Sequence, residues 1–182
     1  YLGYLLLNTL NDILDFPQIE TGNIELNYNS FDFAKMMEEA TSVFAQEAHS
    51  KGLELVCIPP SELSMCVLGD EDRLRQVLIN LVGNAVKFTE KGEVVVFAEL
   101  VSATDGFVEI TLSVSDTGVG FPEESMDWVY NAYSQAGGAT TSKFDGEGLG
   151  LSVSKKLVKL MGGVISLQSK SAEGSIFSFT LT

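Results

Sequence analysis

Two amides and a lysine in "NLVGNAVKFT" (residues 80–89) have the spacing of a single helical face. Asn80 and Asn84 are four residues apart, and Lys87 follows one turn later. Their neighbours are apolar, and amides beside a buried stripe are costly unless they meet a ligand or a partner. A neutral amide oxygen suits Mg²⁺ that nucleotide phosphates already hold. The alternative is that both amides cap loops or face water.

Asp116 is a second candidate, in "SDTGVGFP" (residues 115–122). It stands where an alternating strand ends, and Gly118 and Gly120 follow it. A carboxylate at a strand end, beside backbone freed by glycines, can accept a hydrogen bond from an exocyclic amine such as that of adenine. The alternative is an ordinary Asp-Thr-Gly turn.

A third candidate is the glycine-rich stretch "DGEGLGL" (residues 145–151), which leads into an apolar helix beginning near Leu149. Gly146, Gly148 and Gly150 free the backbone to turn its amides inward. A helix N-terminus adds positive potential, so a phosphate would be stabilised there. A tight loop without a ligand is the alternative.

The residues around these glycines both support and complicate a phosphate site. Lys143, Thr140 and Thr141 could supply a cation and hydroxyl donors to terminal phosphates, although Lys143 could equally be solvated. Asp145 and Glu147 flank the glycines and would repel phosphate unless they point away or help to hold a metal. We expect both acids to face solvent.

The charge of the chain argues against a nucleic-acid partner. The formal net charge is -14 over 182 residues, whereas phosphate-backbone binding needs clustered Lys and Arg. Cys57 and Cys66 lie in apolar contexts, and we expect two buried free thiols in a reducing compartment.

Targeting signals are not recognisable in this sequence. It contains no run of 18 or more apolar residues and no signal peptide. Because the chain begins at Tyr1 rather than Met, we expect a fragment of a longer protein. We expect it to be soluble and on the cytoplasmic side of any membrane, which leaves membrane attachment of the parent open.

The remaining sequence predicts the elements that must hold these groups. Residues 1–16 have an apolar helical stripe that ends at Pro17. This helix is too apolar to stand alone, so we expect it to pack on a partner; the alternative is an edge helix of the main core. After it we predict strands at 23–28, 53–58, 64–69, 92–100 and 107–116, and helices at 33–50 and from 70 to about 86.

Local signals mark the ends of several of these elements. Gly52 ends a helix, and Asp105-Gly106 forms a hairpin turn. The rest of the chain predicts a short helix at 125–133, a loop at 134–148, a helix at 149–161 and a closing hairpin. This order predicts an α+β fold, a two-layer sandwich with a mixed sheet and helices on one face.

Together, the motifs resemble those of sensor histidine kinases, in the catalytic ATP-binding domain shared with gyrase-like and chaperone-like ATPases (the GHKL superfamily). "NLVGNAVKFT" is similar to the N box, "DTGVG" to the first glycine box and "GEGLGL" to the second. "YNAY", with Tyr130 and Tyr133, resembles the aromatic box, where the family usually has phenylalanines. "LNDILDFPQIETGNIEL" resembles the end of the second dimerisation helix and its linker in hybrid kinases.

The resemblance implies a division of the chain into two parts. Residues 1–20 would be the C-terminal part of the second dimerisation helix and its linker. Residues 21–182 would form the catalytic domain, with the Bergerat-type ATP-binding fold and an ATP lid at about 134–148.

The resemblance also implies roles for individual residues. Asp116 would bind the adenine amine, and Asn84, with Asn80 beside it, would coordinate Mg²⁺. Catalysis would rest on Asn80, Lys87 and Lys143, through positioning and charge neutralisation. The other ATP-binding residues would be Phe88, Gly118, Gly120, Tyr133, Thr140, Thr141, Gly146, Gly148, Leu149 and Gly150.

The phosphoacceptor of this family is missing from the chain. In the family it is a His in the first dimerisation helix, followed by an acid and a short Arg-Thr-Pro run. Here the only His is His49, in "QEAHSKGLEL", which reads as an exposed helix-end residue. We therefore expect the phosphoacceptor His on a separate dimerisation domain, a response-regulator receiver domain downstream, a homodimeric parent and a largely monomeric fragment.

Two other functions remain open from the sequence. An ATPase of the same superfamily usually has a glutamate base at the first N-box position, where Asn80 cannot take a proton from water. A nucleotide-sensing or scaffold module with decayed kinase activity is the other. The intact Asn, Asp and Gly set speaks against lost binding, whereas Tyr130, Tyr133, Asp145 and Glu147 keep reduced activity open.

Overall fold

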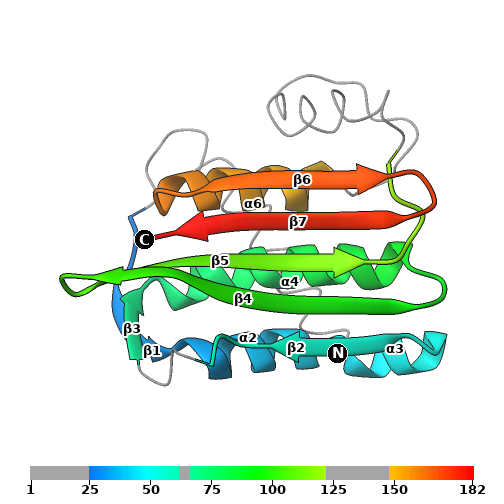
Figure 1. Ribbon diagram of the computed structural model, residues 1–182, viewed down its shortest axis with the longest axis horizontal. Helices are drawn as coiled ribbons and strands as arrows, with labels where there is room; N and C mark the ends of the chain where they lie inside the picture. Colours follow the sequence, from blue (N-terminus) through cyan, green and yellow to red (C-terminus); the bar gives the residue numbers. More distant parts are fainter. Residues whose placement is uncertain (1–24, 62–65, 122–147) are drawn as a thin grey trace.

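The computed structural model describes residues 25–61, 66–121 and 148–182. The helices expected at 1–16 and 125–133, and therefore the proposed dimerisation segment, lie outside the described residues. In the described part, a sheet forms one layer and the helices pack on one of its faces (Figure 1). The expected two-layer α+β sandwich is confirmed.

The main sheet is mixed, as expected. Its strand order is β2-β4-β5-β7-β6, in which only the β2–β4 pair is parallel within the described part of the chain. The chain must therefore cross over between β2 and β4, and the helix on the sheet face makes that crossover. The strands are β2 (Glu54–Ile58), β4 (Glu93–Thr104), β5 (Phe107–Asp116), β6 (Val164–Lys170) and β7 (Gly174–Leu181).

The helices cover the sheet from one edge to the other. In Figure 1, α2 and α3 lie behind β2, α4 behind the centre, and α6 behind β6 and β7. Their bounds are α2 (Phe33–Ser42), α3 (Ala45–Lys51), α4 (Glu71–Phe88) and α6 (Gly148–Leu160). None of the helices in the described ranges is both long and apolar enough to cross a membrane.

A small second sheet corrects the first predicted strand. The strand expected at 23–28 is wrong in position, because β1 is Asn29–Asp32 and pairs antiparallel with β3 (Cys66–Gly69). The residues just before β1 are held elsewhere, since the Asn27 N–H donates to Asp70 Oδ2 at 2.9 Å. Only Phe31 of this strand is buried. The alternation in residues 23–28 therefore did not indicate which residues pair with β3.

The single helix expected at 33–50 is two helices, α2 and α3. The break falls at Val43 and Phe44, where the Phe44 N–H donates to the Thr41 carbonyl at 3.1 Å in a tighter turn. The Phe44 ring packs against Gly83 of α4, where an added Cβ would lie 3.0 Å from the ring. The apolar pattern runs on through the break because both helices use the same side. Gly52 ends α3 in a left-handed conformation, as expected.

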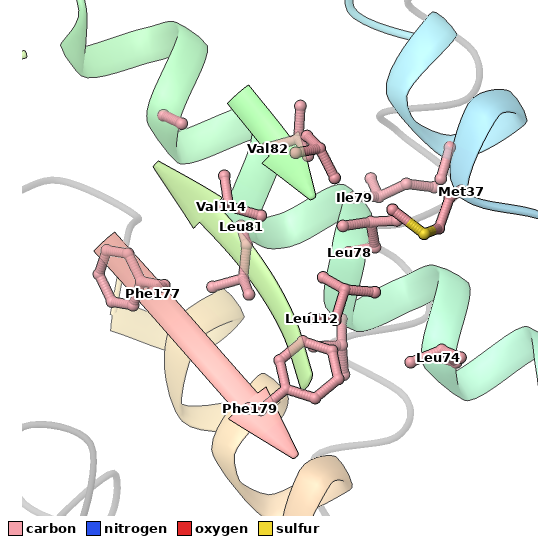
Figure 2. Close-up of a cluster of buried hydrophobic side chains, with 14 of the residues drawn as sticks. Met37, Leu74, Leu78, Ile79, Leu81, Val82, Leu112, Val114, Phe177 and Phe179 are labelled. Atoms are coloured by element: carbon pink, nitrogen blue, oxygen red, sulfur yellow. The ribbon is translucent and has the colours of Figure 1, made fainter. Parts of the chain in front are cut away.

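The core lies between the helices and the inner face of the sheet. Figure 2 shows Met37 of α2 against Leu78 and Ile79 of α4, with Leu112 of β5 and Phe179 of β7 beyond them. Side chains of α4 are buried along its whole length. This helix is therefore the central element on which the sheet and the other helices are assembled.

Met37→Ala tests the contact between α2 and α4. Met37 is fully buried, so we expect the variant to lose about 2 to 4 kcal/mol of unfolding free energy through transfer and cavity costs. Urea denaturation followed by circular dichroism measures the loss. Met161→Ala, at a half-buried site after α6, is the matched control, and an equal loss in both variants would contradict the assigned core.

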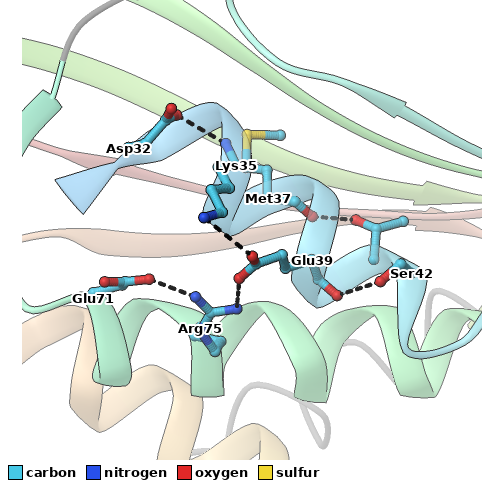
Figure 3. A network of polar contacts seen from close by, with 8 residues as sticks. Asp32, Lys35, Met37, Glu39, Ser42, Glu71 and Arg75 are labelled. Atoms are coloured by element: carbon cyan, nitrogen blue, oxygen red, sulfur yellow. Dashed lines mark hydrogen bonds and ion pairs between the residues drawn. The ribbon is translucent and has the colours of Figure 1, made fainter.

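Polar contacts fix the N-terminal half of α4 against α2. Arg75 of α4 binds Glu71 one turn earlier and Glu39 of α2, with 3.1 Å to the latter's Oε2 (Figure 3). Asp32 caps the first turn of α2 by accepting from the Lys35 N–H at 3.0 Å. These contacts fix the N-terminal half of α4, and the candidate site lies at its C-terminal half.

The two cysteines are free, as expected, but they are not both buried. Cys57 is half-buried on β2, and Cys66 is exposed on β3. On β3, Cys66 alternates with Val67, which packs against the core, so Cys66 faces outward although its sequence neighbours are apolar.

Candidate functional site

The two amides lie on α4, as expected, but their surroundings differ. Asn80 and Asn84 are both half-buried and stand one turn apart. The Asn80 Nδ2 donates to the Gly150 carbonyl at 3.3 Å and approaches the Ser154 Oγ at 3.5 Å. Within residues 25–61, 66–121 and 148–182, the Asn84 side chain makes no hydrogen bond. Asn80 is therefore partly engaged by the protein, and the Asn84 amide is available to a ligand.

Asn80 joins α4 to the beginning of α6. An added Cβ on Gly150 would lie 3.4 Å from the Cγ and the Oδ1 of Asn80, which is ordinary van der Waals contact. The two motifs that contain these residues are far apart in sequence, and the hydrogen bond brings them together. Helix α6 begins at Gly148, and Leu149 lies in its first turn, within one residue of the expected start.

Asp116 is the last residue of β5 and points toward the helices. It continues the inward alternation of Ile110, Leu112 and Val114, and its exposed fraction is 9%. The Gly118 N–H donates to its Oδ1 at 2.8 Å. Backbone N–H groups therefore engage part of the carboxylate, which keeps further acceptor capacity.

Burial raises the pKa of the Asp116 carboxyl above its ordinary value. The backbone N–H groups of Gly118 and Ser175 oppose that rise by hydrogen bonding to the charged form. A buried carboxylate with a raised pKa costs stability at neutral pH, and such groups cluster at functional sites. This is the pattern expected of a carboxylate kept for a ligand.

Gly118 and Gly120 are required by close backbone contacts. An added Cβ on Gly118 would lie 2.7 Å from the Phe88 carbonyl, so this glycine lets the loop after β5 touch the end of α4. Gly120 has φ +60°, and an added Cβ would lie 2.1 Å from the Lys170 carbonyl. The first of these contacts puts Asp116 and the C-terminal end of α4 in one place.

Lys87 and Phe88 form that end of α4. Lys87 is exposed, and its ammonium lies 5.5 Å from the centroid of the half-buried Phe88 ring. The sequence did not indicate Lys51 of α3, whose Nζ donates to the Val86 carbonyl at 2.7 Å and the Lys87 carbonyl at 3.1 Å. A cation at a helix C-terminus is favourable, but no local pattern pairs residues this far apart.

Thr117 is a second residue that the sequence did not single out. Its Oγ1 accepts from the Glu93 N–H at 3.0 Å, and its own N–H donates to the Glu93 carbonyl at 3.2 Å. An added Cβ on Gly92 would lie 2.1 Å from that Oγ1, so the start of β4 closes tightly on Thr117. The sequence signal that could have indicated Thr117 was its position directly after Asp116.

The structure brings together Asn80, Asn84, Lys87, Phe88, Asp116, Gly118 and Gly150 around the C-terminal half of α4. Gly120 contacts the β6–β7 turn instead. Gly148 and Leu149 begin α6. The remaining expected site residues lie outside the described residues: Tyr133, Thr140, Thr141, Lys143 and Gly146.

The side-chain oxygens at this site suit a magnesium ion that is also coordinated by a bound ligand. In the described ranges, no group of three or more His, Cys, Asp or Glu residues could bind a metal by itself. The Oδ1 atoms of Asn84 and Asn80 remain as neutral oxygen ligands, since the Asn80 contacts use its Nδ2. Mg²⁺ commonly keeps most of its coordination for phosphate and water, so one or two such oxygens suffice.

Comparison with known proteins identifies the relatives of this arrangement. Residues 69–182 match the family described as histidine kinase-, DNA gyrase B- and HSP90-like ATPase. The chain is 40% identical over 177 residues to hybrid signal transduction histidine kinase L of Dictyostelium discoideum, covering 97% of this chain and 10% of that protein. It is 39% identical over 187 residues to sensor protein GacS of Pseudomonas syringae pv. syringae, covering 100% and 21%.

Solved structures give the same result for the fold. The full-length ShkA crystal structure in complex with AMPPNP matches with a TM-score of 0.78 and 34% identity, covering 97% of this chain and 35% of that one. A nucleotide-free catalytic domain of the histidine kinase ThkA matches with a TM-score of 0.67 and 28% identity, covering 87% and 95%. The chain spans only 10% and 21% of the two curated relatives named above.

Proposed function

This chain belongs to the histidine kinase-, DNA gyrase B- and HSP90-like ATPase family, and from that premise we propose that it binds Mg-ATP and donates the γ-phosphoryl group to a histidine. That histidine would belong to a dimerisation domain, in a two-component phosphorelay with a receiver domain. The observation that carries the proposal is the buried Asp116 carboxylate beside the end of α4.

In this proposal, each described side chain has one task. Asp116 accepts a hydrogen bond from the adenine amine, and its burial excludes competing water. Asn84 and Asn80 turn amide oxygens toward the metal, and Lys87 carries a positive charge near the phosphates. Bound Mg²⁺ would neutralise phosphate charge during transfer.

The remaining expected site residues extend this proposal. Tyr133, Thr140, Thr141, Lys143 and Gly146 would form the lid side of the site, and Leu149 would line the nucleotide pocket. Residues 1–20 would be the end of a dimerisation helix. We propose a homodimeric parent and a monomeric isolated chain, which sedimentation equilibrium would distinguish from a tight dimer.

The acceptor histidine is proposed to lie outside this chain. His49 is exposed near the end of α3, a position that suits a solvated residue rather than an acceptor in a dimerisation helix. In favour of a kinase over a hydrolase, Asn80 lacks the basicity to activate water, and its amide nitrogen already binds Gly150. One relative named above, hybrid signal transduction histidine kinase L, also carries a kinase name.

The experiment has two stages. MgADP is titrated against the chain by calorimetry, and then [γ-³²P]ATP is added together with a separately made dimerisation segment that contains the His. Transfer of label to the segment supports the kinase. Release of free phosphate instead would favour the ATPase, binding with neither outcome a sensor module, and no binding at all would refute the proposal.

A further inference from the structure

The turn between β6 and β7 lies directly against the loop that follows Asp116. The Ala172 N–H donates to the Val119 carbonyl at 2.7 Å. Added Cβ atoms would collide on both sides of the contact, 2.1 Å from the Lys170 carbonyl at Gly120 and 1.9 Å from the Asp116 carbonyl at Gly174. Residues 170–174 and 117–121 therefore form one tightly packed backbone unit.

Ser169, the penultimate residue of β6, is the side chain that joins the two parts of this unit. Its hydroxyl accepts from the Phe121 N–H at 2.8 Å and donates to the Gly174 carbonyl at 2.9 Å. The Ser175 Oγ lies 2.9 Å from the Ser169 Oγ. A hydroxyl has one proton, which Ser169 gives to Gly174, so the Ser175 hydroxyl must donate to Ser169. Every bond in this small network thus has a defined direction.

The network reaches Asp116 from two directions. Ser175 pairs with Asp116 across β5 and β7, and its backbone N–H contributes to the hydrogen bonding of the Asp116 carboxylate. On the other side, Phe121 ends the described loop whose Gly118 N–H binds Asp116 Oδ1. A shift of Ser169 would therefore move both groups that orient the carboxylate.

We propose that Ser169 is a positioning residue for the nucleotide site, which acts by holding the 117–121 loop and Ser175 around Asp116. The inference rests on the proposed function, because it concerns how Asp116 meets the nucleotide. Ser169 itself does not touch the ligand in this proposal. Its loss changes the geometry of the carboxylate and of the adjoining backbone.

Ser169→Ala should raise the Kd for MgADP by about tenfold, because it leaves the Phe121 N–H and the Ser175 hydroxyl without their partner. In the transfer assay, the KM for ATP should rise by a similar factor while kcat stays within about twofold. Ser169→Thr retains the hydroxyl and should restore the affinity. Calorimetry and steady-state kinetics measure these effects.

Ser178→Ala is the matched control. Ser178 also lies on this hairpin and binds a neighbouring hydroxyl, that of Ser113 at 2.8 Å, but on the opposite face of the sheet. If Ser169 acts only on stability, both alanine variants will keep wild-type nucleotide affinity and lose similar unfolding free energy. That result would overturn the inference while the proposed function stood.

The remaining outcomes are also decisive. If the wild-type chain itself binds no nucleotide, the proposed function and this inference both fail. If Ser169→Ala does not fold, Ser169→Cys, which keeps the volume but accepts hydrogen bonds weakly, takes its place. Wild-type affinity in a folded Ser169→Cys variant, or failure of Ser169→Thr to restore binding, would then overturn the positioning role.

Discussion

Replacing Asp116 with Asn should weaken MgADP binding by about 100-fold while making the folded domain more stable at neutral pH. The loss of affinity arises because a hydrogen bond to a charged group contributes about 1.5 to 3 kcal/mol. The Asn carbonyl can still accept from the Gly118 N–H, as Asp116 Oδ1 does at 2.8 Å. Its NH₂ group then stands where the adenine amine needs an acceptor, and two donors repel each other.

The gain in stability follows from the pKa of Asp116. Burial raises the folded-state pKa above the unfolded value, so over the interval between the two the folded chain binds more protons than the unfolded chain. Stability therefore falls as pH rises through that interval, and the full cost remains above the folded pKa. The Asn variant avoids this cost, so its advantage should be largest at neutral pH and shrink under acid conditions.

Thermal unfolding at pH 7 and at pH 4, with and without MgADP, measures both effects. Asp105→Asn is the matched control, because Asp105 lies in the exposed β4–β5 turn at φ 52°, a conformation that Asn tolerates. This control should not alter nucleotide affinity. Unchanged MgADP affinity in Asp116→Asn would remove Asp116 from the site, and a variant less stable than wild type at pH 7 would contradict the cost of burial.

The inward direction of Asp116 was available from the sequence. Residues 108–114 alternate, and a residue two positions beyond Val114 must share its face. The start of α4 at Asp70 and the end of α3 at Gly52 could also be predicted, because a helix cap depends only on neighbouring backbone groups. The expected family was also correct, since motifs of fixed spacing reflect local geometry around a ligand.

The alignment of Asp116 with β4 could not be predicted. Asp105-Gly106 forms the hairpin turn, but an irregularity at Val101 shifts the register, so that Val94 rather than Val95 faces Asp116. Without that shift, the inward side chains of the two strands would not match. No Gly or other local signal at Val101 marks the irregularity.

Contacts between distant segments account for the other differences. The break between α2 and α3 depends on the space that Gly83 leaves for the Phe44 ring, and the position of β1 depends on its pairing with β3. Ser169, Thr117 and Lys51 were missed for the same reason, since each holds backbone far away in sequence. From a single sequence, residues whose side chains can do chemistry are easier to identify than the residues that hold them in position.

Asn84→Ala should weaken the magnesium dependence of nucleotide binding and reduce phosphoryl transfer by about 100-fold. In the described ranges the Asn84 side chain makes no hydrogen bond, so its loss should cost the folded state little. Alanine is also the better helix former by about 0.5 kcal/mol, and the unfolding free energy should be unchanged or slightly higher. A kinetic defect in a fully stable variant would therefore report on the ligand alone.

Asn80→Ala provides the contrast, because the two amides stand one turn apart on the same helix. Its loss breaks the hydrogen bond to the Gly150 carbonyl and frees the beginning of α6. This variant should bind ADP more weakly in EDTA as well as in Mg²⁺, whereas Asn84→Ala should match wild type in EDTA.

Titrations of ADP with Mg²⁺ and with EDTA, for both variants and the wild type, separate the two roles. If Asn84→Ala keeps the full magnesium enhancement, Asn84 is not a metal ligand and the metal is held elsewhere. If Asn80→Ala loses affinity only in Mg²⁺, its bond to Gly150 has no effect on binding, and both amides act through the metal. The predicted split requires that the Asn80 amide nitrogen hold the beginning of α6 in addition to any metal contact of its oxygen, whereas the Asn84 amide acts through the metal alone.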